Sequence, residues 1–134
     1  ALESELSDEK QIYISTGLGG RGGKLRFYVL ILANELKPFL EYQKKVIERE
    51  FPYSLENADC EIERLTIGEK HVELVFLIPV RTDIKQTLDK VINECNQYGN
   101  FLSQVFTITN VKELSAEEVE EIIKKNGGNS KESH

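Results

Sequence analysis

Apolar residues recur along this chain at two spacings, and the spacing changes from one segment to the next. A period of two residues predicts a strand, whereas a period of three to four predicts an amphipathic helix. In chain order, the pattern predicts a strand over Leu25–Ala33, a helix from Asn34 to about Glu50, strands over Cys60–Ile67 and His71–Val80, a helix between Asp83 and Gly99, and a strand over Phe101–Thr109. The centre of the chain therefore has the order β-α-β-β-α-β.

The segments before this centre are an acidic lead and one further strand. Residues 1–10 carry four acids against one lysine, and Gln11–Thr16 has the β-rich composition of a strand. We expect one α+β domain over residues 11–125, with its core in residues 25–109.

The segment after the centre is predicted to be a short helix followed by a tail. Ser115 and Glu118 have the spacing of a capping box, which predicts an acidic helix through Lys125. The Asn-Gly-Gly run that follows is expected to stop the helix, so residues 126–134 are predicted to be a disordered tail.

The element order resembles the ferredoxin-like βαββαβ antiparallel sandwich, here with an extra N-terminal strand and a short C-terminal helix. Right-handed crossovers would put both central helices on one face of the sheet and His71–Val80 between Leu25–Ala33 and Cys60–Ile67. Leu25–Ala33 then already has two neighbours, so Gln11–Thr16 is expected at an edge, beside Cys60–Ile67. The alternation slips at Arg64–Leu65, which indicates a bulge.

The strand Leu25–Ala33 is apolar on both faces, which indicates that something covers each side of the sheet. Five side chains would project from the face opposite the central helices: Tyr28, Leu30, Leu32, Val75 and Leu77. Such a patch is unusual on a monomer. Either the helix Ser115–Lys125 or a second subunit must cover it. Because that helix offers only three apolar residues, we expect a face-to-face homodimer.

Composition and charge exclude several classes of protein. The 134 residues carry a formal charge of −6, but Lys10 to Lys112 hold 14 bases against 13 acids, so the acidity belongs to the ends. A nucleic-acid partner is therefore predicted to be unlikely, since such proteins usually show a basic stripe. No apolar run approaches the roughly 20 residues of a membrane span. Cys60 and Cys95 are predicted to be buried thiols of a cytoplasmic protein.

The glycine-rich segment Gly17–Lys24 is the most conspicuous motif. Its spacing does not match a phosphate-binding P-loop, and the strand that follows offers no helix N-terminus to hold a phosphate. A looser anion site remains open, formed by exposed backbone N–H groups and flanking cations. Its candidate residues are Gly19, Arg21, Gly22, Lys24 and Arg26.

Other reactive side chains show no catalytic or metal-binding spacing, and no cofactor is expected. His71 begins a strand and is expected at the surface. The glutamates around it, Glu61, Glu63, Glu69 and Glu73, are expected on solvated strand faces, and a Cys95–His71 dyad stays open.

From these patterns we expect a self-associating interaction or regulatory domain without catalytic activity, with itself or a larger protein assembly as its partner. The alternative is a small anion-binding protein or enzyme that uses the Gly17–Lys24 loop.

Overall fold

The computed structural model describes residues 11–13 and 23–132, and the side chains of residues 23–127. The described elements are β1 (Gln11–Tyr13), β2 (Lys24–Ala33), the 3₁₀ turn η1 (Asn34–Leu36), α2 (Glu41–Asn57), β3 (Glu61–Ile67), β4 (His71–Pro79), α3 (Ile84–Asn96), β5 (Leu102–Thr109) and α4 (Ala116–Glu132). None of the helices in these residues is long and apolar enough to cross a membrane.

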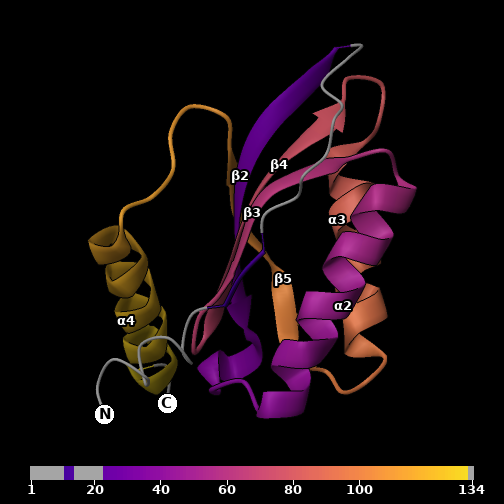
Figure 1. Cartoon of the computed structure of the whole chain (residues 1–134). Coiled ribbons are helices and arrows are strands. Elements are labelled where there is room, and N and C mark those ends of the chain that lie inside the picture. The colour runs from indigo at the N-terminus through magenta and orange to yellow at the C-terminus, as the bar shows by residue number, and fades with distance from the viewer. Residues whose placement is uncertain (1–10, 14–22, 133–134) are drawn as a thin grey trace.

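The strands form one antiparallel sheet in the order β1-β3-β4-β2-β5. This order confirms the ferredoxin-like α+β fold, with β4 between β2 and β3 (Figure 1). β1 pairs with β3 at the edge, where the sequence placed it, although residues 14–16 of the predicted strand lie outside the described part of the chain.

Helices α2 and α3 cover one face of the sheet (Figure 1). Between them and the sheet lies the larger apolar core, which includes Val29, Ile31, Phe51, Leu74, Phe76, Leu88 and Val91. These side chains come from alternate positions of the strands and from the inward stripe of each helix, as the two periods predict.

The first helix begins later and ends later than predicted. A proline holds the residue before it in extended backbone, and Lys37 before Pro38 has φ −84° and ψ 136°. The helix therefore starts only at Glu41, and the segment before it forms η1, with Glu35 and Leu36 in the left-handed region. Pro52 does not end the helix, which continues to Asn57.

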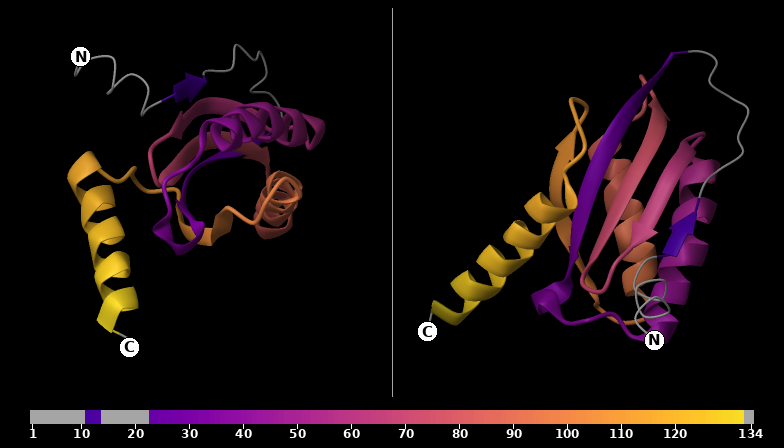
Figure 2. Two further views of the ribbon diagram at one scale, coloured as in Figure 1. Left: turned by 90° about the horizontal axis from the view of Figure 1, so that it is seen from below. Right: turned by 60° about the vertical axis from the view of Figure 1, so that its left-hand side comes forward.

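Helix α4 covers the other face of the sheet (Figure 2). Tyr28, Leu30, Leu32 and Val75 are buried in a second apolar cluster with Val119 of α4. Leu36, Leu114, Ile122 and Ile123 pack against this cluster, and Leu77 is half-buried. The face expected to form a dimer is thus covered from within the chain. Leu36 and Leu114, which lie outside the helix, add to the three apolar residues of α4 and complete the cover.

Helix α4 also extends beyond the predicted stop. Its start has the predicted capping box: the Ser115 N–H donates to Glu118 Oε1 at 2.7 Å, and the Glu118 N–H donates to Ser115 Oγ at 3.1 Å. The Asn-Gly-Gly run does not end the helix, which reaches Glu132. Each glycine weakens a helix by about 1 kcal/mol but keeps its N–H group, so the backbone ladder can continue.

Candidate functional site

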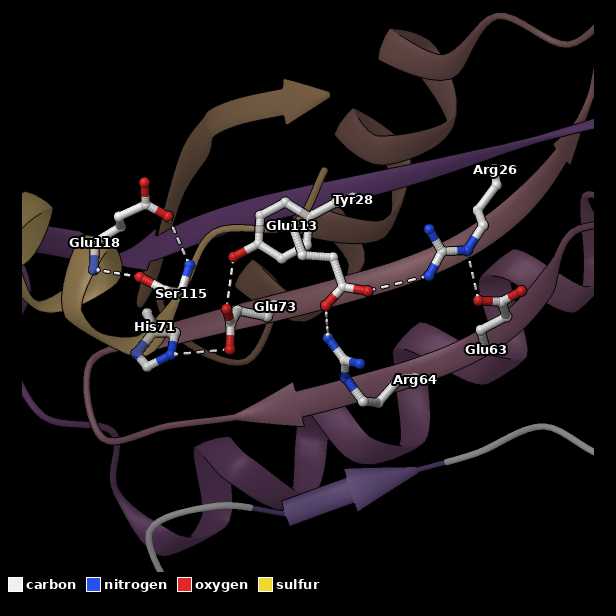
Figure 3. Close-up of polar contacts among 9 residues, drawn as sticks. All are labelled: Arg26, Tyr28, Glu63, Arg64, His71, Glu73, Glu113, Ser115 and Glu118. Atoms are coloured by element: carbon white, nitrogen blue, oxygen red, sulfur yellow. Dashed lines mark hydrogen bonds and ion pairs between the residues drawn. The ribbon is translucent and has the colours of Figure 1, made fainter. Parts of the chain in front are cut away.

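A row of polar side chains crosses the sheet on the face that carries α4 (Figure 3). Its first part joins β4 to β2. His71 and Glu73 are two positions apart on β4, so both point to this face. The Tyr28 hydroxyl of β2 donates to Glu73 Oε2 at 2.5 Å, and His71 Nε2 lies 3.6 Å from Glu73 Oε1. One carboxylate therefore holds both the phenol and the imidazole.

Burial and hydrogen bonding tune this group. Burial by itself would raise the pKa of the Glu73 carboxyl, but the contacts with His71 and Tyr28 and the charge of Arg64 outweigh it, so the pKa lies below its usual value. Burial, and then the hydrogen bond to Glu73, raise the pKa of the Tyr28 phenol. Tyr28 is only 2% exposed. Glu73 is thus ionised at neutral pH, and Tyr28 remains a neutral hydrogen-bond donor.

The β3–β4 turn holds the His71 side chain in place. The Gly68 N–H donates to the His71 carbonyl at 2.8 Å and closes the turn. A Cβ at position 68 would overlap the His71 imidazole ring. Any side chain at position 68 would therefore displace the ring, which packs directly over the turn.

A cleft of about 390 Å³ opens beside His71, between the β3–β4 turn and α4. Its walls are formed by Gly68, Glu69, Lys70, His71 and Glu73 from the sheet, and by Ala116, Glu117, Val119, Glu120 and Ile123 from α4 and its start. Four of these residues are glutamates and one is a lysine. The cleft is therefore acidic on balance, and Lys70 is its permanent cation.

The second part of the polar row is a cluster of two arginines and two glutamates. Arg26 of β2 donates through Nε to Glu63 at 2.8 Å and through Nη2 to Glu113 Oε2 at 3.0 Å. Arg64 of β3 donates through Nη2 to Glu113 Oε1 at 2.6 Å. The hydrogen bond from Arg64, and then that from Arg26, lower the pKa of the Glu113 carboxyl despite some desolvation.

The bulge predicted near Arg64 is present and helps to build this cluster. The register between β3 and β4 shifts between Ile62 and Arg64. The extra residue allows Glu63 and Arg64, which are consecutive in sequence, to join the same network (Figure 3). Glu113 comes from the segment between β5 and α4, far away in sequence.

Chemically, this arrangement offers two things. His71 with Glu73 can transfer a proton, and Arg26 with Arg64 forms an anion-binding clamp. A carboxylate that orients an imidazole is the usual support for a histidine that acts as general acid or base. In the described residues, no three His, Cys, Asp or Glu side chains come close enough to hold a metal ion.

The site residues predicted around the glycine loop are only partly brought together. Gly19, Arg21 and Gly22 lie outside the described residues. Lys24 forms an ion pair with Glu61 at 3.1 Å, while Arg26 belongs to the arginine cluster.

The two cysteines take no part in the site. Cys60 and Cys95 are free, buried thiols, as expected, and burial raises their pKa values to about 11 and about 12. Cys95 of α3 packs in the larger apolar core, whereas His71 lies beside α4 on the other face of the sheet. A Cys95–His71 dyad is therefore absent.

The glutamates on this face have a role that their positions in the sequence did not predict. Glu73 was expected on a solvated strand face, but its side chain is only 16% exposed because α4 lies over it. The only signal was the His-x-Glu spacing itself, which places the two side chains on one face of a strand.

Comparison with known proteins gives structural neighbours only. No protein-family model matches the chain, and no curated protein sequence matches it. A candidate transposase from Deinococcus radiodurans R1 is similar in structure, with a TM-score of 0.60 and 12% identity, covering 83% of this chain and 98% of the other. A REP-associated tyrosine transposase bound to a REP hairpin has a TM-score of 0.55 and 11% identity, covering 83% of this chain and 68% of the other. At these identities the likeness shows a shared fold.

These neighbours contradict two predictions made from the sequence. The prediction of a non-catalytic, self-associating regulatory module is wrong, because both neighbours are described as transposases. The prediction that proteins are the partners and nucleic acid is unlikely is also wrong, because one neighbour is bound to a REP hairpin. The dimer argument needed a bare sheet face, and α4 covers that face. The nearly equal numbers of bases and acids from Lys10 to Lys112 do not show that two arginines converge at one point of the sheet.

Proposed function

We propose that this chain is a nucleic-acid-binding domain of transposase type, which holds a hairpin strand on the α4 face of its sheet. The observation that carries the proposal is the fold shared with a transposase bound to a REP hairpin. The polar row supports this face as the binding surface, because Arg26 and Arg64 converge there, and Lys70 adds one cation among the four glutamates of the cleft.

The charge of the chain predicts how such binding behaves. A protein with a net charge of −6 gains little from the general attraction between a basic surface and a polyanion. Binding must instead depend on a few placed contacts with phosphates and on the shape of the hairpin. We therefore expect a shallow salt dependence and a clear preference for a hairpin over an unpaired strand.

The test is fluorescence anisotropy of labelled DNA at several salt concentrations. The probes are a hairpin, an unpaired strand of the same composition and a plain duplex. Lys70→Ala removes the cation of the cleft and should weaken hairpin binding by roughly threefold to tenfold, as expected for one phosphate contact. Lys90→Ala removes the same charge from α3 on the far side of the sheet and should change binding less than about twofold. Absence of hairpin binding by the unmodified protein would refute the proposal, and equal effects of the two lysines would place the strand elsewhere.

A chemical step at the same cleft is the second candidate, and the contact between His71 and Glu73 favours it. With Nε2 directed at Glu73, Nδ1 of His71 would take the proton of a water molecule as the water oxygen bonds to a backbone phosphorus. The P–O bond to the leaving strand would break, and the imidazolium would return the proton to the departing oxygen. Tyr28 does not fit the role of attacking group, because it is buried and its hydroxyl is already bonded to Glu73.

Strand cleavage can be followed on a denaturing gel with an end-labelled hairpin, with and without Mg²⁺ or Mn²⁺. His71→Ala should abolish cleavage while hairpin binding remains. Cleavage that persists in the His71→Ala protein would exclude His71 as the proton-transfer group.

A further inference from the structure

Two arginines, Arg26 and Arg64, donate to the Glu113 carboxylate from separate strands. Arg26 and Arg64 belong to β2 and β3, which are not neighbours, since β4 lies between them. Strands two places apart are separated by roughly 10 Å. Both guanidinium groups nevertheless reach across β4 and donate to one carboxylate, one to each of its oxygens (Figure 3).

This geometry suits a phosphodiester at least as well as a carboxylate. A phosphodiester carries one negative charge and two non-bridging oxygens, and guanidinium groups bind such paired oxygens well. Each Glu113 oxygen receives one guanidinium N–H, so a phosphodiester could replace the carboxylate oxygen for oxygen. The exchange also conserves charge at the clamp, because a carboxylate and a phosphodiester each carry one negative charge. Arg26 keeps its separate hydrogen bond to Glu63 through Nε.

The clamp is open to an incoming strand. The side chains of Arg26 and Arg64 are 49% and 35% exposed, and that of Glu113 is 31% exposed. Single exposed ion pairs contribute little to stability, and a network of several charges contributes more. Because these side chains remain in contact with solvent, an incoming anion can reach the guanidinium groups without unfolding the sheet.

We propose that Arg26 and Arg64 form a phosphate-binding site for the nucleic-acid backbone, and that Glu113 occupies it as an internal substitute until a strand displaces it. The inference rests on the proposed function, because it takes nucleic acid as the ligand. It adds the contact point and a built-in competitor.

The position of Glu113 gives this competition a consequence for the cleft. Glu113 lies in the short segment between β5 and α4, two residues before Ser115, which caps α4. Leu114, next to it, packs against the apolar cluster under α4. Release of Glu113 by a phosphate would therefore loosen the segment that anchors the start of α4, and α4 forms one wall of the cleft beside His71.

The test is hairpin binding by charge-matched variants, measured by anisotropy on the full chain. Glu113→Gln removes the competing charge and should tighten binding by about tenfold, the size of one charge-assisted contact. Its salt slope should steepen by about one counterion. Glu121→Gln removes the same charge from an exposed position of α4 that lines neither the clamp nor the cleft, and should change binding less than about twofold.

Two further variants separate the clamp from a general charge effect. Arg64→Gln should weaken binding, and in the double variant with Glu113→Gln the gain should disappear, since one half of the clamp is missing. Glu113→Ala should repeat the effect of Glu113→Gln if removal of the charge, and not the new amide, is responsible. Thermal unfolding of each variant shows that it is folded.

The possible failures are distinguishable. If the unmodified protein binds the hairpin but Glu113→Gln behaves like Glu121→Gln, the clamp proposal is overturned and the proposed function stands. If neither the unmodified protein nor any variant binds the hairpin, both are overturned.

Discussion

The cover of the sheet by α4 makes a direct prediction about stability. Val119 is the most buried apolar residue that α4 contributes to the second cluster, at 3% exposed. Val119→Ala removes two carbon atoms from that contact, worth about 1.6 kcal/mol at roughly 0.8 kcal/mol per buried methylene. A small cavity adds to this loss. The better helix propensity of alanine offsets up to about 0.5 kcal/mol. The net expectation is a loss of about 1–2 kcal/mol in the free energy of unfolding.

The assay is urea unfolding followed by circular dichroism, with Val111→Ala as the matched control. Val111 is 85% exposed, so the same substitution there should cost less than about 0.5 kcal/mol. The midpoint for the unmodified protein should also stay constant over a hundredfold range of protein concentration, because the cover belongs to the same chain. If Val119→Ala and Val111→Ala have equal effects, α4 does not shield the sheet. A midpoint that rises with concentration would restore the second subunit as the cover.

Three further predictions follow from the site and the core. Folding lowers the pKa of the Glu73 carboxyl, so the contribution of Glu73 to stability is present at neutral pH. This contribution is lost as pH falls from the unfolded pKa of about 4.3 through the lower folded pKa. Glu73→Gln should flatten this part of the pH–stability curve, and an unchanged slope would contradict the ion-pair assignment. Gly68→Ala should push the imidazole of His71 off the turn and destabilise the protein by about 1–3 kcal/mol, which the ring resonances of His71 and thermal unfolding would reveal; unshifted resonances would argue against this packing. Cys60 and Cys95, with pKa values of about 11 and about 12, should resist a disulfide reagent at pH 8 in the native protein and react in guanidinium; rapid reaction of the native thiols would mean that the core opens readily.

The parts of the fold that the sequence predicted are those that depend on local patterning. A spacing of two residues identified β2 to β5, and a spacing of three to four residues identified the two central helices. The crossover rule then left one order for the central strands. The capping box at Ser115 and the bulge near Arg64 were predicted for the same reason, because each depends on a few adjacent residues. The helix boundaries were less accurate: the restriction that Pro38 imposes on Lys37 moved the start of α2.

The site depended on contacts between residues far apart in sequence, and no local pattern specifies those. Glu113 meets Arg26 across 87 positions and Arg64 across 49, and the segment that carries it follows no regular period. Glu73 is a strand residue with an outward position in the sequence pattern, and the packing of α4 made that position half-buried. The amino-acid order by itself therefore determined which segments become strands and helices, and in what order they pair. The way α4 folds back over the sheet decided which side chains share one surface. An apolar stripe shows that one side of a helix is buried, but it does not show which part of the protein that side will contact.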